Sequence, residues 1–149
     1  MYWKGSNDLI GNRLKIKPLY PDSEVPERKT SGAAGYDLYS HTSGILPPGS
    51  WATIPTGVAM EIPPGCYGAV RGRSSILKRG MIVDGTIDED YRGEVYVMIY
   101  NASDDVQNII QGERIAQLVV QRYEGTPVEI VEELSKTQRG DRGFGSTGR

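Results

Sequence analysis

The acidic segment 88–94 is the first place where side chains of a catalytic type gather. It holds four carboxylates, and Asp88 follows Ile87 directly at the end of a short apolar run. Carboxylates bind divalent metals and act as general bases. A solvated turn is the commoner form of such a cluster. At Asp88, however, the backbone of a predicted hairpin could hold the carboxylate, and this favours a functional role.

Three further positions carry side chains suited to phosphate or metal. Arg73 precedes two adjacent hydroxyls, Ser74 and Ser75, a combination that can contact phosphate oxygens. The same hydroxyls could instead cap a local turn. Asp37 follows small residues that let chains pass closely, and it could orient a metal-bound water or simply begin a strand. In the amphipathic run 112–118, only Gln117 indicates more than a plain strand.

The C-terminal segment from residue 138 combines four glycines with one large apolar side chain, Phe144. Such a segment cannot bury enough surface to order itself, so we expect a mobile arm in the absence of a ligand. Glycine N–H groups, the Arg139 guanidinium and the hydroxyls of Ser146 and Thr147 could converge on an anion. Phe144 could then close over a planar ring. A plain disordered tail is the competing interpretation.

Short apolar or alternating runs, punctuated by glycine and proline, must position these side chains, because helical periodicity is almost absent. This pattern is typical of an all-β sandwich or barrel. We predict strands at residues 14–17, 51–54, 58–62, 67–71, 81–83, 94–100, 114–120 and 128–132. Turn signals include 55–57 and Asp84-Gly85, and residues 74–79 fit one helical turn. The run 95–100 is apolar at both parities, which predicts cover on both faces by a second sheet or another subunit.

Composition narrows the class of protein. The chain has 149 residues, which fits one domain, and a formal net charge of -2 with both signs interspersed, so a basic nucleic-acid face is not expected. Cys66 and His41 are the only residues of their types, so we expect neither a disulfide nor a Cys–His nucleophile. No run has the length of a membrane span, and the first residues lack a signal-peptide layout. We expect a soluble intracellular protein of the cytoplasm or nucleus, and a viral origin is as compatible as a cellular one.

In order along the chain, five segments resemble the five motifs of the trimeric deoxyuridine triphosphatases (dUTPases). The segments are Ala34-Gly35-Tyr36-Asp37-Leu38, Gly72-Arg73-Ser74-Ser75, Gly85-Thr86-Ile87-Asp88-Glu89-Asp90-Tyr91-Arg92-Gly93, Gly112-Glu113-Arg114-Ile115-Ala116-Gln117-Leu118 and Arg139-Gly140-Asp141-Arg142-Gly143-Phe144-Gly145-Ser146-Thr147-Gly148. The resemblance implies hydrolysis of dUTP to dUMP and pyrophosphate with Mg²⁺. That reaction limits uracil incorporation into DNA and supplies dUMP for dTMP synthesis.

The resemblance also implies an architecture. The fold would be a jelly-roll-like β-barrel (β-clip) with a flexible glycine-rich C-terminal arm. The single domain 1–149 would comprise an extra N-terminal segment at 1–12, the barrel core at 13–138 and the mobile arm at 139–149. Three subunits would form a homotrimer with active sites shared between them, and neither nucleic acid nor membrane would be a partner.

At the reacting centre, Asp88 resembles the general base that activates water for in-line attack on the α-phosphorus. Tyr91 resembles the ring that packs against the deoxyribose, where a ribose 2′-hydroxyl would not fit. Asp37 resembles the aspartate that reaches the metal through water. Magnesium itself would be held mainly by substrate phosphates, which suits its reluctance to dehydrate.

The remaining motif residues resemble substrate contacts. Arg73, Ser74 and Ser75 correspond to phosphate contacts, with Ser74 near the bridging oxygen that breaks, and Gln117 corresponds to an amide that holds water and phosphate. In the arm, Phe144 resembles a lid stacked on uracil beside Gly145, while the β- and γ-phosphates would be gripped by Arg139, Ser146 and Thr147.

The hairpin that would read uracil departs from the family pattern. It comprises Asp84, Gly85, Thr86 and Ile87, and the stretch from Arg73 to Asp88 is about two residues shorter than in many relatives. Uracil is expected to be read here by backbone hydrogen bonds. The Asp84 carboxylate could accept from uracil N3–H but could not donate to O4.

Two other functions remain open alternatives. A deoxycytidine triphosphate deaminase, or a bifunctional deaminase–triphosphatase, shares the barrel and would release ammonia from dCTP. A dUTPase-like regulator would instead bind a partner protein and use nucleotide as a switch. The pieces around Tyr91 and Phe144 favour the simple triphosphatase over the deaminase.

Overall fold

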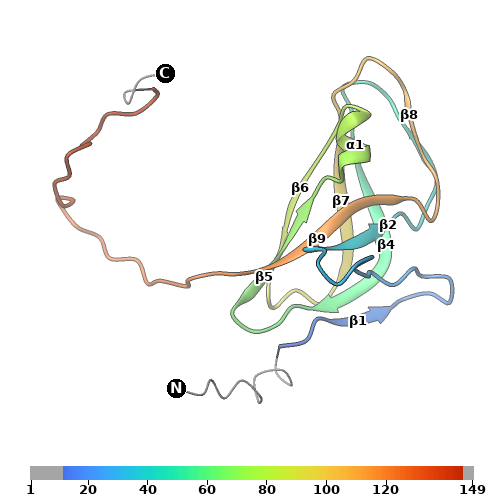
Figure 1. Ribbon diagram of the computed structural model, residues 1–149, viewed down its shortest axis with the longest axis horizontal. Coiled ribbons are helices and arrows are strands. Elements are labelled where there is room, and N and C mark those ends of the chain that lie inside the picture. Colours follow the sequence, from blue (N-terminus) through green and yellow to red (C-terminus); the bar gives the residue numbers. More distant parts are fainter. Residues whose placement is uncertain (1–11, 146–149) are drawn as a thin grey trace.

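The structure is a computed structural model that describes residues 12–145 (Figure 1). The described residues form nine strands and one short helix: β1 (Lys15–Pro18), β2 (Gly35–Tyr39), β3 (Gly44–Leu46), β4 (Trp51–Glu61), β5 (Cys66–Arg71), α1 (Ser74–Lys78), β6 (Met81–Ile87), β7 (Glu94–Asn101), β8 (Gln107–Ile109) and β9 (Arg114–Arg122). The predicted all-β class is confirmed. Within this part of the chain, no helix combines the length and apolarity needed to cross a membrane.

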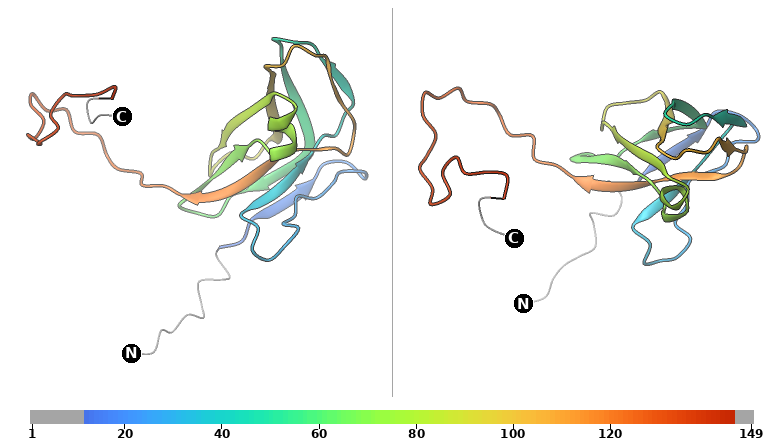
Figure 2. Two further views of the ribbon diagram at one scale, coloured as in Figure 1. Left: turned by 45° about the horizontal axis from the view of Figure 1, so that its top comes forward. Right: turned by 90° about the horizontal axis from the view of Figure 1, so that it is seen from above.

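Seven strands form one continuous antiparallel sheet in the order β1-β4-β7-β6-β5-β9-β2, while β3 and β8 pair separately. The sheet curls into a half-barrel (Figures 1 and 2). Strand β6 joins its two halves, because its first residues, Met81 to Val83, pair with β7 and its last, Asp84 to Ile87, pair with β5. The curl gathers the inward side chains of both halves into one core.

The core follows the two-residue period of the strands. In β7, Val95, Val97 and Ile99 are fully buried, whereas Tyr96 and Met98 between them are exposed. The prediction that this run is covered on both faces, by a second sheet or by another subunit, is confirmed for the inner face and stays a prediction for the outer face. Only the inner face has a partner layer, and the outer face is left open to another molecule.

Two predicted turns are wrong. Residues 55–57 lie inside β4, where a register shift against β7 and the positive φ of Gly57 (72°) form a bulge rather than a turn. Asp84 and Gly85 lie inside β6, paired with Arg71 and Val70 of β5. The Asp-Gly dipeptide marks the point where β6 changes its neighbour strand, so the backbone stays extended there.

The connection from β5 to β6 places the second motif. The predicted helical turn forms as α1, which buries Ile76 against the core. Arg73 is its N-cap residue with an extended backbone, and Ser74 and Ser75 are its first two residues. Gly80, with a φ of 77°, ends the turn and leads into β6.

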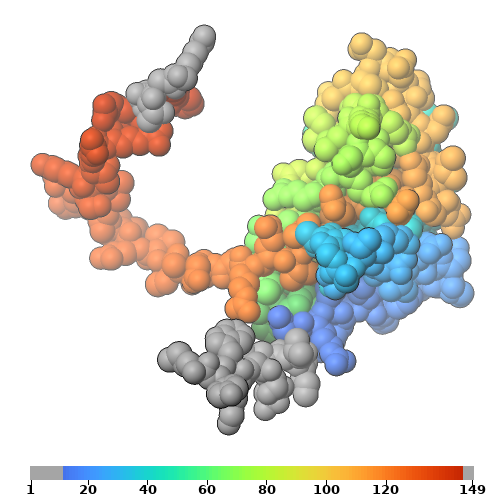
Figure 3. All heavy atoms as spheres, in the orientation of Figure 1, coloured from blue at the N-terminus to red at the C-terminus, as the bar shows by residue number. Residues whose placement is uncertain are grey.

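The chain leaves the barrel directly after β9, before residue 139 where the arm was expected to begin. Residues 123–145 are exposed and extend away from the body in all views (Figures 1, 2 and 3). The predicted strand at 128–132 is not formed. Val128 and Ile130 are 92% and 96% exposed, since none of the described strands lies beside them to complete a ladder.

Candidate active site

Five of the expected site residues meet in one concavity of about 550 Å³ beside β2, β9 and the segment that follows β5. Its walls carry Asp37, Arg73, Ser74, Ser75 and Gln117, together with Lys29, Arg114 and the small residues Ala33, Ala34 and Gly35. The strand register explains this meeting: Asp37 pairs with Gln117, and Gln117 with Arg71, two residues before Arg73. We call this concavity the phosphate pocket. Motifs one, two and four thus converge within a single chain.

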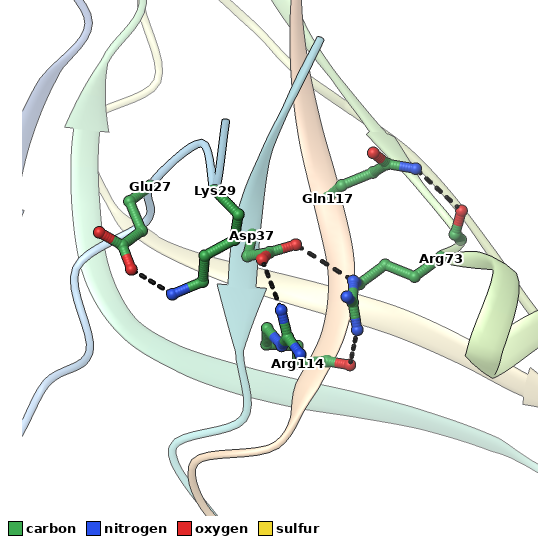
Figure 4. Close-up of polar contacts among 7 residues, drawn as sticks. Glu27, Lys29, Asp37, Arg73, Arg114 and Gln117 are labelled. Atoms are coloured by element: carbon green, nitrogen blue, oxygen red, sulfur yellow. Dashed lines mark hydrogen bonds and ion pairs between the residues drawn. The ribbon is translucent and has the colours of Figure 1, made fainter. Parts of the chain in front are cut away.

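Asp37 lies between two guanidinium groups (Figure 4). Its Oδ1 lies 3.1 Å from Nε of Arg73, and its Oδ2 accepts a hydrogen bond of 3.3 Å from Nη1 of Arg114. Only 11% of the Asp37 side chain is exposed, so these ion pairs are better shielded from water than ordinary surface pairs. The carboxylate therefore fixes both cations at the pocket wall before any ligand enters.

Gln117 lines the pocket beside the second motif (Figure 4). Its Nε2 donates to the backbone oxygen of Gly72 at 3.2 Å, which ties β9 to the start of the second motif. A Cβ atom at position 35 would lie 2.3 Å from Gln117 Oε1. Glycine at position 35 is thus the residue that leaves room for this amide.

Two cations of the phosphate pocket were missed from the sequence, Lys29 and Arg114. Lys29 forms an ion pair with Glu27, whose hydrogen bond raises the pKa of the lysine. Three positive side chains (Lys29, Arg73, Arg114) against two negative ones (Asp37 in the wall and Glu27 paired with Lys29) leave a net charge of about one positive at the pocket wall. Arg114 lies in the fourth motif and could have been found there, whereas Lys29 sits in a loop with no pattern to point to it.

Asp88 lies in a different concavity of about 670 Å³, which we call the acidic pocket. It is lined by Tyr67, Thr86, Asp88, Glu89, Asp90 and Tyr123. Tyr91 lies nearby on the same loop, with its hydroxyl donating to the Glu94 carbonyl at 2.8 Å. A Cβ atom at position 93 would lie only 2.5 Å from the Tyr91 hydroxyl oxygen. Glycine at position 93 is therefore needed to leave room for the Tyr91 side chain.

The predicted uracil-reading residues belong to β6, which ends at Ile87 beside Asp88. Asp84 forms an ion pair of 2.5 Å with Arg71 across the β5–β6 pair. Gly85 pairs with Val70, Thr86 is exposed in the acidic pocket, and Ile87 is buried. The Asp84 carboxylate is thus already engaged by a cation of its own chain.

The sheet register separates the two pockets. The phosphate pocket lies at the level of Arg71, whereas Asp88 lies beyond the Gly68–Ile87 pair at the level of Tyr67. Four residues along the strand span about 13 Å, and Arg73 lies two residues farther along the chain, so its backbone stands about 15 Å or more from that of Asp88. Within one chain, Asp88 therefore lies outside the reach of a group bound at Arg73.

The arm is also apart from both pockets. Phe144 is fully exposed with a positive φ of 48°, and Arg139 donates from Nε to the Arg142 carbonyl within the arm itself. Gly145 is the last described residue, with a φ of 84°. Ser146 and Thr147 lie outside the described residues.

The comparison with known families decides what these pieces are. A family model for dUTPases matches residues 22–148, which takes in all five motifs. The chain belongs to the dUTPase family. The deoxyuridine 5′-triphosphate nucleotidohydrolase of Monkeypox virus is 46% identical over 127 residues, covering 85% of this chain and 84% of that protein. The one from Anaeromyxobacter sp. (strain Fw109-5) is 46% identical over 133 residues, covering 87% and 90%.

Solved dUTPase structures share the fold. The dUTPase of Staphylococcus bacteriophage 80alpha with dUpNHpp matches with a TM-score of 0.86 at 32% identity, covering 93% of this chain and 99% of that chain. A mutant dUTPase from phage phi11 of S. aureus, in which a structural Mg(II) ion is coordinated, matches with a TM-score of 0.78 at 26% identity, covering 84% and 100%. The half-barrel is therefore the dUTPase fold, as expected from the sequence.

Proposed function

We propose that the chain hydrolyses dUTP by in-line attack of an Asp88-activated water on the α-phosphorus, in a site assembled from several subunits. Membership of the dUTPase family supports the overall reaction, dUTP and water giving dUMP and pyrophosphate. The observation that carries the mechanism is the convergence of Arg73, Ser74, Ser75 and Gln117 around the clamped Asp37. The phosphate pocket binds the triphosphate, and the acidic pocket of another chain supplies the base.

The charge of the phosphate pocket suits the substrate. A triphosphate carries about four negative charges, and one Mg²⁺ leaves about two for the protein to neutralise. The net charge of the pocket wall has the opposite sign, and Arg139 of the arm would add a second positive charge. Because Asp37 already holds Arg73 and Arg114 in place, these cations need little reorganisation when the substrate binds.

The donor set of the pocket fits a magnesium ion that rests mostly on the substrate. Among residues 12–145, no group of three or more His, Cys, Asp or Glu side chains could hold a metal ion, so this part of the chain offers no cage of its own. Asp37 has spare lone pairs beyond its two arginine contacts and would reach the ion through water. When bound, Mg²⁺ would neutralise charge on the phosphate oxygens.

The chemical step then needs one proton acceptor and one stabilised leaving group. Asp88 removes a proton from water as its oxygen bonds to the α-phosphorus, and the bond to the bridging oxygen breaks. Ser74 and Arg73 stabilise the negative charge that develops on the departing pyrophosphate. Closure of the arm then excludes bulk water and fixes the geometry of the reacting groups. In the closed arm, Phe144 covers the base next to Gly145. The β- and γ-phosphates are bound by Arg139, Ser146 and Thr147.

Base and sugar selection falls to the strand and loop around Asp88. The β6 backbone from Asp84 to Ile87 reads uracil, and the Tyr91 ring blocks a 2′-hydroxyl at the deoxyribose. Asp84 takes part only indirectly, because its carboxylate pairs with Arg71. Uracil is then recognised by backbone N–H and C=O groups. A wrong base would leave some of these groups without a hydrogen-bond partner, and this cost gives the selectivity.

Three observations on the single chain support a homotrimer with shared sites. The phosphate pocket and Asp88 stand about 15 Å or more apart. The outer face of β7 leaves Tyr96 and Met98 exposed, and the arm presents Val128 and Ile130 to solvent. Each of these features is completed by another copy of the chain.

Pyrophosphate release from each deoxynucleoside triphosphate, with and without Mg²⁺, tests the proposed function. We expect release from dUTP alone, dependent on the metal. Asp88→Asn should lower kcat by at least about 10³-fold while the Kd for dUpNHpp changes little, since the base acts only on the chemical step. Turnover of dUTP by Asp88→Asn at the wild-type rate would remove Asp88 from its role, and ammonia release from dCTP would favour the deaminase.

A further inference from the structure

The loop that carries Asp88 is anchored by its neighbour, Glu89. Oε2 of Glu89 accepts two hydrogen bonds, one of 2.9 Å from the Gly65 N–H and one of 2.7 Å from the Tyr123 hydroxyl. Gly65 lies in the turn between β4 and β5, and Tyr123 directly follows β9. One carboxylate oxygen thus joins three segments that are distant in the sequence.

Tyr123 is also the root of the C-terminal arm. Its N–H donates to the Gly65 carbonyl at 3.2 Å, so both its backbone and its side chain are fixed at the same place. We call Gly65, Glu89 and Tyr123 the arm-root junction. Beyond it, residues 124–145 are exposed. The junction is therefore the last point at which the barrel holds the arm and sets its direction.

The loop itself is stiffened around Glu89. The Tyr91 N–H donates to the Asp88 carbonyl at 3.2 Å, and Nη1 of Arg92 donates to the Glu89 carbonyl at 2.6 Å. These bonds fold residues 88–92 into a closed turn. With the turn closed on itself, the Glu89 side chain decides where the whole turn, including Asp88, lies relative to the barrel.

We propose that Glu89 and Tyr123 are positioning residues, which through their mutual hydrogen bond hold the Asp88 loop and the root of the C-terminal arm in one fixed relation. The inference rests on the proposed function, in which Asp88 is the base and the arm closes over the nucleotide. Neither residue touches the substrate in this scheme. They act by keeping the base-bearing loop and the origin of the lid from moving independently.

The charge state of the junction agrees with this geometry. The Tyr123 hydroxyl and the Gly65 N–H lower the pKa of Glu89, and the Glu89 carboxylate raises the pKa of Tyr123. At neutral pH the glutamate is thus ionised and the tyrosine protonated, which is the combination that gives a charge-assisted hydrogen bond.

The chain offers a matched control on β7. There the Glu94 carboxylate accepts from the Gly57 N–H at 2.9 Å and from the Tyr96 hydroxyl at 3.0 Å, the same donor types as at the junction. Tyr96→Phe removes a tyrosine–glutamate hydrogen bond of the same kind without touching the arm root. Because Tyr96 lies on the face proposed to contact another copy of the chain, size-exclusion chromatography first verifies that this variant assembles like the wild type. Tyr96→Phe then measures what the loss of such a bond does by itself.

The experiment compares Tyr123→Phe, Glu89→Gln, their double variant and Tyr96→Phe in the full-length protein. Steady-state kcat and KM for dUTP are measured, together with thermal unfolding. Each variant is also made with Phe144→Trp, whose fluorescence change at saturating dUpNHpp reports closure of the arm. Tyr123→Phe deletes a single oxygen atom, so it keeps the test informative even where a Glu89 variant folds poorly.

We expect Tyr123→Phe and Glu89→Gln each to lower kcat by about threefold to tenfold, the scale of one hydrogen bond. The double variant should be no slower than the slower single variant, because Tyr123→Phe removes and Glu89→Gln weakens the same contact. The fluorescence change should shrink in these variants and stay at the wild-type level in Tyr96→Phe, with similar melting temperatures for all.

The proposal is overturned if Tyr123→Phe and Glu89→Gln match Tyr96→Phe in kcat and in fluorescence, or if their effects multiply in the double variant. Asp88→Asn, measured in parallel, separates this failure from that of the proposed function. A fully active Asp88→Asn refutes the proposed function. An inactive Asp88→Asn beside a Tyr123→Phe with wild-type kinetics refutes the arm-root junction alone.

Discussion

Two inactive variants should restore activity to each other when their chains are mixed. Arg73→Ala removes a cation from the phosphate pocket, and Asp88→Asn removes the base from the acidic pocket. The register places Arg73 beyond Arg71 at one end of the β5–β6 pair and Asp88 beyond Ile87 at the other. Reacting groups must approach to about 3–3.5 Å, whereas these two stand about 15 Å or more apart along and across the sheet. A working site therefore takes them from different chains.

The size of the rescue follows from how sites are assembled. When the two variants mix at random in equal amounts, about a quarter of the sites take the intact Arg73 from one chain and the intact Asp88 from another. We expect about a quarter of the wild-type rate of pyrophosphate release per chain after co-refolding. Each variant alone sets the baseline.

A second mixture calibrates the first. Wild type mixed equally with the double variant Arg73→Ala/Asp88→Asn should also keep about a quarter of its sites intact if sites are shared, but about half if each chain holds its own. A mixture of the single variants that stays at the baseline, with about half the activity in the second mixture, would refute the shared site.

Three further predictions concern single features of the chain. Gly35→Ala should displace the Gln117 amide, because the new Cβ atom would lie 2.3 Å from Gln117 Oε1. We expect kcat for dUTP to fall by about tenfold, and an unchanged kcat in steady-state kinetics would show that the amide is dispensable. Deletion of residues 139–149 should abolish most activity without lowering the melting temperature, because the described part of the segment is exposed. Calorimetry measures the melting temperature and pyrophosphate release measures the activity. A truncated protein with full activity would show that the arm has no catalytic role. The pKa of Glu89 is lowered in the folded chain from an ordinary value near 4.5, so its hydrogen bonds stabilise the fold above that value and the contribution is lost as the pH falls through the lowered pKa. Carboxyl NMR titration should show this pKa rising in Tyr123→Phe, and no change would contradict the contact.

Several strands were predictable from the sequence, because short runs of β-branched and apolar residues between turn residues mark them. The residues of β1, β5, β7 and β9 were placed to within a few positions. The short strands β3 and β8 were not, because three residues carry no period. Asp84-Gly85 misled for a different reason: a dipeptide that favours a tight turn also tolerates the place where β6 exchanges β7 for β5.

The candidate site was predictable as a set of residue types but not as a place. Asp37, Arg73 and Gln117 come from three separate segments, and only the register of β2, β9 and β5 brings them together. The clamp of Asp37 by Arg114 could not be anticipated, since a charged residue at a strand start usually points to solvent. The separation of Asp88 from this group is likewise a property of the sheet, which no local pattern records.

The outer face of β7 shows the limit of a single chain. An unbroken apolar run indicates that both faces are covered, but it does not say by what. Val95, Val97 and Ile99 bury themselves in the core of their own chain, while Tyr96 and Met98 are left exposed. The exposed outer residues of β7 therefore indicate a contact with another chain, which the fold of a single chain cannot display.

The central claim is that water, activated by Asp88, attacks the α-phosphorus of dUTP. Hydrolysis in ¹⁸O-labelled water with Mg²⁺, followed by mass spectrometry of both products, tests it most directly. We predict one ¹⁸O atom per turnover in the phosphate of dUMP and none in pyrophosphate, with label incorporation lost in Asp88→Asn. Label in pyrophosphate would place the attack on the β-phosphorus, and label-free dUTP remaining intact after prolonged incubation would contradict the activity itself.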